Sequence, residues 1–218
     1  MRSITILLAI SICVFFLVQS VFSTKSCKLS PINVRSKNFD GLYIEGFGVK
    51  TAHDVKLKVK KDFIELTSKD FKNSHITVED EGDYTTYLMD KIVINTPALN
   101  KLNGKTLPAE INFVYKKERN GSGNNPNNLA ILTTLYKFGK FGGSPFWDEV
   151  IKALKRNKKM DVLKFKNLLD ITDSHNGFNY DGTLTSPPCK PVEWSISSKI
   201  HAISISQFRA LKAAMKKR

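Results

Sequence analysis

The chain has 218 residues, of which 41% are hydrophobic, 10% aromatic and 25% charged. These proportions suit a chain that buries one ordinary core, and they exclude a disordered, collagen-like or multi-spanning membrane protein. The formal charge is +14, from 34 Lys and Arg against 20 Asp and Glu, so anionic polymers are favoured partners. With four histidines and three cysteines, few residues are candidates for a metal site or a disulfide framework.

The N-terminus has the pattern of a secretory signal peptide. A basic start precedes an apolar run from Ile4 to Val18, which is shorter than the ~20 residues that cross a bilayer. The same shortness disfavours an uncleaved anchor, and the small residues that follow place cleavage after Ser23. We therefore expect residues 1–23 to be removed and residues 24–218 to form one secreted, extracellular domain without a membrane span.

Signal cleavage removes Cys13 and leaves two cysteines, Cys27 and Cys189. An even pair in an oxidising compartment indicates one disulfide rather than two free thiols. Its loop would cover most of the mature chain, so loop entropy predicts a stabilisation of the order of 4 to 5 kcal/mol. Asn120 begins the one acceptor sequon, Asn-Gly-Ser, and predicts a glycoprotein if the host is eukaryotic.

The pattern in the first half of the chain predicts strands. From Asp54 to Tyr115 hydrophobic and polar residues alternate, which is typical of antiparallel strands with one buried face. The clearest runs are residues 55–60, 75–78 and 110–115. Residues 119–128 are predicted to be a loop and residues 129–138 a further strand.

A helix is predicted to begin at Ser144 and Pro145, because proline suits the first turn of a helix. Its apolar face would consist of Phe146, Val150, Ile151 and Leu154. After a turn at residues 173–176 and a strand at 192–196, Ser204 or Ser206 is predicted to cap a short final helix. Strands on both sides of an isolated helix favour a mainly β or α+β fold over a doubly wound sheet.

The segment Tyr180 to Cys189, Tyr-Asp-Gly-Thr-Leu-Thr-Ser-Pro-Pro-Cys, closely resembles the signature near the active site of α-class carbonic anhydrases. Further matches follow the family's order: Ser30 to Val34, Asn73 to His75, Asn103 to Lys105, Pro108 to Glu110, Val192 to Trp194 and Phe208 to Leu211. The resemblance implies a large, twisted, mostly antiparallel sheet with short peripheral helices. Relative to the family, both ends of the chain are expected to be trimmed.

In active members of this family three histidines hold zinc, two at i and i+2 of one strand and one on the neighbouring strand. An ungapped alignment on Asn103-Gly104-Lys105 places these ligand positions at Val93, Asn95 and Asn112. Valine has no lone pair, and a carboxamide oxygen is a poor ligand for zinc. The resemblance therefore implies no zinc, no other metal or cofactor, and loss of carbonate dehydratase activity, because no ion acidifies a bound water.

At other active-site positions of the family, some residues of this chain match the family and others do not. The resemblance assigns His75 to the proton-shuttle position, Glu110 to the residue that orients the third ligand, and Thr185 to the residue that orients the zinc-bound hydroxide. The carboxylate that accepts the threonine's proton aligns with Leu99, and the histidine beside it aligns with Asn100. We interpret His75 as an exposed strand residue and Glu110 as a structural hydrogen-bond acceptor.

Basic residues form several clusters along the chain. In the strand at 55–60 they alternate with apolar residues, which directs three ammonium groups to one side. The candidate residues for binding a polyanion are Lys56, Lys58, Lys60, Lys116, Lys117, Lys155, Arg156, Lys158 and Lys159. Each cluster alone is typical of a solvated surface. Together they favour an extracellular polyanion such as a glycosaminoglycan, or a protein surface, over nucleic acid, for which no reader motif is present.

The sequence thus predicts a secreted pseudoenzyme with the carbonic anhydrase fold that acts as a binding protein. One alternative is an active carbonate dehydratase with a displaced metal site that includes His75. A second alternative is a small-molecule binding protein that uses the cleft remodelled by Val93, Asn95, Asn112 and Leu99. No feature of the sequence indicates an oligomeric state.

Overall fold

The structure is a computed structural model that describes residues 27, 29–39, 41, 44–48, 50–80, 82–119, 123, 125–139, 143–156, 158–163, 177–186 and 188–216. The strands are β1 (Asn33–Val34), β2 (Ile44–Gly48), β3 (Ala52–Val59), β4 (Phe63–Thr67), β5 (His75–Asp80), β6 (Asp83–Asn95), β7 (Lys101–Leu102), β8 (Lys105–Thr106), β9 (Ala109–Lys117), β10 (Leu129–Phe138), β11 (Lys159–Leu163), β12 (Gly177–Thr183), β13 (Pro191–Ser197) and β14 (His201–Ile203). The helices are α2 (Pro145–Lys155) and α4 (Ile205–Lys216), and the 3-10 helices are η2 (Ser36–Asn38) and η3 (Lys69–Asn73).

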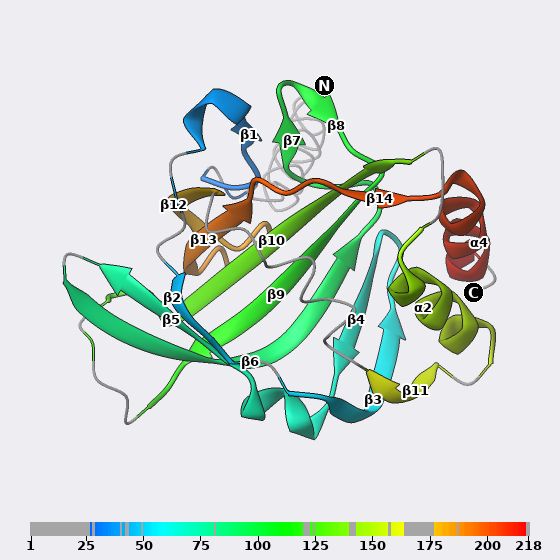
Figure 1. Cartoon of the computed structure of the whole chain (residues 1–218), viewed down its shortest axis with the longest axis horizontal. Helices are drawn as coiled ribbons and strands as arrows, with labels where there is room; N and C mark the ends of the chain where they lie inside the picture. The colour runs from blue at the N-terminus through cyan, green and yellow to red at the C-terminus, as the bar shows by residue number, and fades with distance from the viewer. Residues whose placement is uncertain are drawn as a thin grey trace, which may run out of the picture.

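One large twisted sheet organises the molecule, with the strand order β11-β3-β4-β6-β9-β10-β13-β12 (Figure 1). β5 extends it beside β6, β2 pairs with β5, and β14 pairs with β10. Two pairings, β10 with β13 and β10 with β14, are parallel, and the other pairings of this sheet are antiparallel. The prediction of a mainly β fold with a large, mostly antiparallel sheet and short helices is confirmed.

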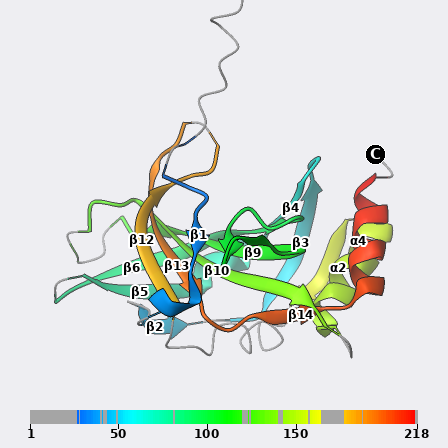
Figure 2. The ribbon, with the colours of Figure 1, turned by 90° about the horizontal axis from the view of Figure 1, so that it is seen from above.

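The main core lies between one face of this sheet and the two α-helices. Alternate residues of the central strands, such as Ile92 on β6 and Ile111 on β9, join Trp147 of α2 and Leu211 of α4 in one buried cluster. Figure 2 shows α2 and α4 together at one end of the sheet, with β12 and β13 at the other. The candidate site lies on the other face of β6 and β9, which points away from this core.

The two predicted helices are present with the expected caps. Ser144 Oγ accepts a hydrogen bond from Phe146 N at the start of α2. Of the two predicted cap residues for α4, Ser204 serves, because its Oγ accepts from Gln207 N at 3.1 Å. The edge strand β11, which pairs with β3, was missed. Its alternation of polar and apolar residues, Lys-Met-Asp-Val, covers only four residues, too short a run to identify a strand.

The predicted disulfide between Cys27 and Cys189 is confirmed. The expected signal peptide, residues 1–23, lies outside the described residues, as do Asn120 of the sequon and the turn at 173–176. Within the described ranges, none of the helices has the length and apolar character required to cross a membrane.

Candidate functional site

The three ligand positions implied by the family resemblance come together on the face of the sheet opposite the α-helices. Val93 on β6 lies in register with Asn112 on β9, and Asn95 follows Val93 by two residues. Alternation along a strand directs the side chains of Val93 and Asn95 to the same side. Asn95 and Asn112 are buried, with 6% and 5% of their surfaces exposed.

Glu110 lies at the centre of this region and is completely buried. Its Oε1 accepts hydrogen bonds from Asn95 Nδ2 and Asn112 Nδ2, each at 3.0 Å. Its Oε2 accepts from Asn100 N at 3.0 Å and from Asn100 Nδ2 at 3.3 Å. Each carboxylate oxygen therefore accepts hydrogen bonds from two donor groups, so this buried acceptor is satisfied.

Two of these asparagines also accept hydrogen bonds through their side-chain oxygens. Asn112 Oδ1 accepts from Thr133 Oγ1 at 2.7 Å, and Asn100 Oδ1 accepts from Ile32 N at 3.1 Å. We call the set Glu110, Asn95, Asn100, Asn112 and Thr133 the Glu110 network. It connects β6, β9 and β10, and two of its members, Asn95 and Asn112, lie at positions where the family resemblance implies zinc ligands.

Burial raises the pKa of the Glu110 carboxyl group, because desolvation disfavours the charged form. The hydrogen bonds from Asn100, Asn112 and Asn95 oppose this shift by stabilising the carboxylate. Neutral amide groups therefore take the role that a cation has beside most buried carboxylates. Burial thus makes the ionised form of Glu110 costly, and the hydrogen bonds from the asparagines offset part of that cost.

The donor atoms at these positions do not fit a zinc ion. Val93 offers no donor, and the amide nitrogens of Asn95 and Asn112 point their hydrogens at Glu110. Within the described ranges, no three or more His, Cys, Asp and Glu side chains are grouped so as to hold a metal ion. The residues present therefore give no support to a zinc site at the family's position.

His75, the residue suggested for a displaced site, lies on β5 opposite Leu88 of β6. Val93 is five residues further along β6, about 16 Å at the usual rise of a strand. His53 is on β3 and His201 on β14, so the described histidines do not converge. The sequence predicted His75 to be exposed, whereas it is half-buried in the structure.

Thr185 lies just after β12 and is half-buried. The position of its expected carboxylate partner is occupied by Leu99, which is 37% exposed. An alkyl side chain accepts no hydrogen bond, so the relay implied by the family resemblance lacks its acceptor.

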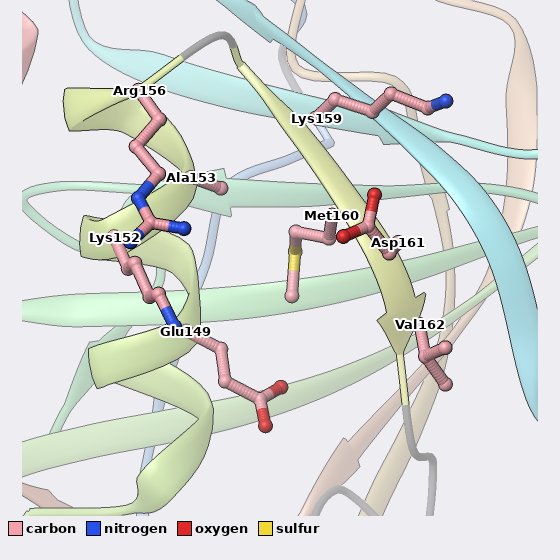
Figure 3. A pocket seen from close by; sticks show the side chains of 8 residues that line it. All are labelled: Glu149, Lys152, Ala153, Arg156, Lys159, Met160, Asp161 and Val162. Carbon is pink, nitrogen blue, oxygen red and sulfur yellow. The ribbon is translucent and has the colours of Figure 1, made fainter.

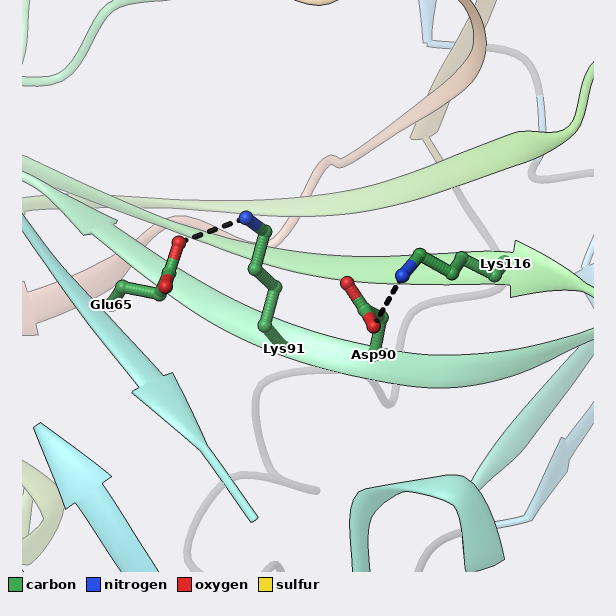
Figure 4. Close-up of polar contacts among 4 residues, drawn as sticks. All are labelled: Glu65, Asp90, Lys91 and Lys116. Atoms are coloured by element: carbon green, nitrogen blue, oxygen red, sulfur yellow. Dashed lines mark hydrogen bonds and ion pairs between the residues drawn. The ribbon is translucent and has the colours of Figure 1, made fainter. Parts of the chain in front are cut away.

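Two ion pairs beside the site were not predicted (Figure 4). Lys91 Nζ lies 2.8 Å from Glu65 Oε2, and Glu65 is in register with Val93. Lys116 Nζ lies 2.7 Å from Asp90 Oδ1. The sequence signal was weak, because each lysine is 26 residues from its partner and only the strand register brings the two together.

Several of the predicted polyanion-binding residues are already engaged. Besides Lys116, Lys159 pairs with Asp54, and Lys117 Nζ donates to the carbonyl oxygens of Gly123 and Asn125. The remaining candidates are exposed and form no ion pair within the described ranges: Lys56, Lys58, Lys60, Lys155, Arg156 and Lys158.

Two adjoining hollows gather basic side chains at the edge of the sheet. A hollow of about 280 Å³ between α2 and β11 is lined by Lys152, Arg156 and Lys159 (Figure 3). A second, of about 560 Å³, is lined by Lys56, Lys69 and again Lys159. We call these five residues the basic edge. Its acidic neighbours in the two linings are Glu149, Asp161, Asp54 and Asp70.

The sequence is similar to known carbonic anhydrases over most of its length. It is 26% identical to alpha carbonic anhydrase 8 of Arabidopsis thaliana over 207 residues, which cover 85% of this chain and 47% of that protein. It is 33% identical to carbonic anhydrase 6 of Mus musculus over 98 residues, 40% of this chain and 31% of that protein. The chain thus spans less than half the length of these relatives.

Solved structures show the same fold. The fungal alpha carbonic anhydrase of Aspergillus oryzae superposes with a TM-score of 0.71 at 21% identity, covering 86% of this chain and 78% of that one. Dioscorin in complex with ascorbate gives 0.65 at 18% identity, over 87% and 77% of the two chains. The profile of the eukaryotic-type carbonic anhydrase family matches residues 23–218. Over nearly its whole length, therefore, this chain belongs to the eukaryotic-type carbonic anhydrase family.

Proposed function

We propose that this protein is a carbonic anhydrase homologue without carbonate dehydratase activity that works as an extracellular binding protein. The absence of carbonate dehydratase activity is proposed on the basis of the Glu110 network. At the two polar ligand positions, the amide groups of Asn95 and Asn112 are both bound to Glu110. A water near these groups would keep its ordinary pKa, because none of them is a Lewis acid.

Zinc binding at this place would also disturb a satisfied buried network. To turn an oxygen toward an ion, Asn112 would have to give up its bond to Thr133. Each buried polar group left without a partner costs about 1 to 3 kcal/mol. A single asparagine oxygen cannot recover that cost, since zinc prefers imidazole and thiolate ligands.

We expect protein purified without chelators to contain no stoichiometric zinc and to hydrate CO2 no faster than buffer. Metal analysis and a stopped-flow hydration assay measure the two quantities on one sample. The variant Val93→His, Asn95→His, Asn112→His tests the scaffold, because it restores three imidazoles at the three positions. Stoichiometric zinc together with turnover in the unmodified protein would refute the proposal.

The binding function is proposed on the cationic surplus and the basic edge. Lys56 and Lys159 are in register on β3 and β11, and Lys159 also lines the hollow that contains Lys152 and Arg156. Basic groups from three elements therefore face adjoining spaces, where their potentials add. The acidic lining residues make the surface mixed, so a sulfated or otherwise densely charged polymer fits better than a single small anion. The expected extracellular location rests on the N-terminal sequence and the disulfide.

We expect the protein to be retained on immobilised heparin at low salt and released at moderate salt, because exposed charges are screened. The variant Lys56→Ala, Lys152→Ala, Arg156→Ala should elute at lower salt. The matched control, Lys37→Ala, Lys101→Ala, Lys105→Ala, removes the same charge from the region of β7 and β8 and should elute close to the unmodified protein. Equal shifts for both variants would show a general charge effect rather than a site at the basic edge.

A further inference from the structure

Two carboxyl groups lie side by side at the far edge of the large sheet. Asp181 on β12 is in register with Glu193 on β13, and directly opposed residues of neighbouring antiparallel strands have their Cβ atoms about 5 Å apart. Glu193 is 9% exposed, and Asp181 is exposed. Like charges at such a position destabilise a strand pair.

One amide group joins the two carboxyl groups to a neighbouring loop. Asn127 Nδ2 donates to Asp181 Oδ1 at 2.8 Å and lies 3.4 Å from Glu193 Oε2. Asn127 belongs to the connection between β9 and β10, and its own backbone N–H donates to Asn125 Oδ1 at 2.8 Å. The contact therefore ties this connection to β12 and β13.

The charged surroundings of the pair are predominantly acidic. Together with Asn125 and Asn127, Asp181 and Glu193 line a hollow of about 250 Å³ that Glu79 of β5 also faces. On the loop side, the ammonium group of Lys117 donates to the carbonyl oxygens of Gly123 and Asn125. The hydroxyl group of Tyr87, on β6, donates a hydrogen bond to the Asn127 carbonyl oxygen.

We propose that Asp181, Glu193 and Asn127 form a proton-dependent latch, which holds residues 125–128 against β12 and β13 while the two carboxyl groups share a proton. The shared proton sits on Glu193, and its O–H group donates to the Asp181 carboxylate. When Glu193 loses this proton to solvent, two adjacent carboxylates remain with only amide donors between them. Their repulsion then loosens the contact of the loop with the sheet.

The direction of the pH effect follows from the environment of Glu193. Burial, and then the charge of Asp181, raise the pKa of Glu193 from 4.5 to about 7. Between these two values the folded protein holds a proton that the unfolded chain has released, so stability falls as the pH rises. The latch is therefore closed while Glu193 is protonated, opens with a midpoint at about pH 7, and is open well above that pH.

Hydrogen exchange of the backbone amides of Asn125, Asn127 and Asn128 measures the latch in the intact protein, since Pro126 has no amide hydrogen. After correction for intrinsic exchange, we expect about tenfold faster exchange at pH 8 than at pH 5, the ratio that one unit of pKa represents. The variant Glu193→Gln keeps a neutral donor to Asp181, so the transition should be lost. The variant Asp181→Asn removes the repelling charge, so deprotonation of Glu193 should no longer loosen the loop and the transition should be lost here as well.

Glu65→Gln is the matched control, because it makes the same change at the Lys91 ion pair on the other side of the sheet. It should keep the transition of the unmodified protein. Circular dichroism of each variant verifies that the fold is retained. The proposal is overturned if exchange in residues 125–128 is independent of pH, or if Glu193→Gln retains the transition.

Discussion

Glu110→Ala is expected to lower the free energy of unfolding by about 3 to 5 kcal/mol. The substitution leaves the backbone N–H of Asn100 and the amides of three asparagines without their acceptor in a buried region. Each such donor costs about 1 to 3 kcal/mol. The total cost is smaller than the sum over these donors, for two reasons. The asparagine side chains can turn toward other acceptors, and the variant no longer has to bury a carboxylate. Urea denaturation at neutral pH measures the difference.

Glu65→Ala is a suitable control for this experiment, because Glu65 lies on the same face of the sheet in a partly exposed ion pair with Lys91. Exposed pairs contribute about 0 to 1 kcal/mol. Glu110→Gln should be intermediate, since its oxygen keeps two of the four donors and its amide nitrogen faces the others. If Glu110→Ala were no more destabilising than Glu65→Ala, the Glu110 network would not hold the strands together as argued above.

Removal of the disulfide by Cys27→Ser with Cys189→Ser is expected to cost about 4 to 5 kcal/mol. The two cysteines are 162 residues apart in sequence, so the bond restricts the unfolded chain over most of its length. Nearby, Ser30 Oγ bonds to the Tyr180 hydroxyl and accepts from Thr183 N. These contacts hold the same N-terminal segment and partly compensate in the variant.

Guanidinium denaturation of the oxidised protein and the double variant, each with and without reductant, measures this contribution. The reductant should lower the stability of the unmodified protein toward that of the variant and leave the variant unchanged. A loss below about 1 kcal/mol would mean that the unfolded chain is already compact without the bond, so that its entropy is little affected.

The family and the fold class were predictable because the segment around Thr185 is long and specific, and because alternation along β3 and β6 marks a buried face, although β9 is buried on both faces. The helix α2 was equally clear from its proline, cap and apolar stripe. β11 was missed because its alternation covers only the four residues Lys159 to Val162, too short a run to identify a strand.

By itself, the sequence determined the pair of cysteines and the surplus of cations, since these depend on residue identity alone, whereas the three ligand positions follow from the resemblance to the family. It also indicated that Glu110 accepts a structural hydrogen bond. The tertiary structure decided which donors reach that carboxylate, which lysines are neutralised by Glu65, Asp90 and Asp54, and where the basic edge lies. It likewise decided that Asp181 and Glu193 lie directly opposite each other on neighbouring strands. The physical reason is that these contacts join residues far apart in the chain, and only strand register and the packing of helix on sheet bring them within hydrogen-bonding distance.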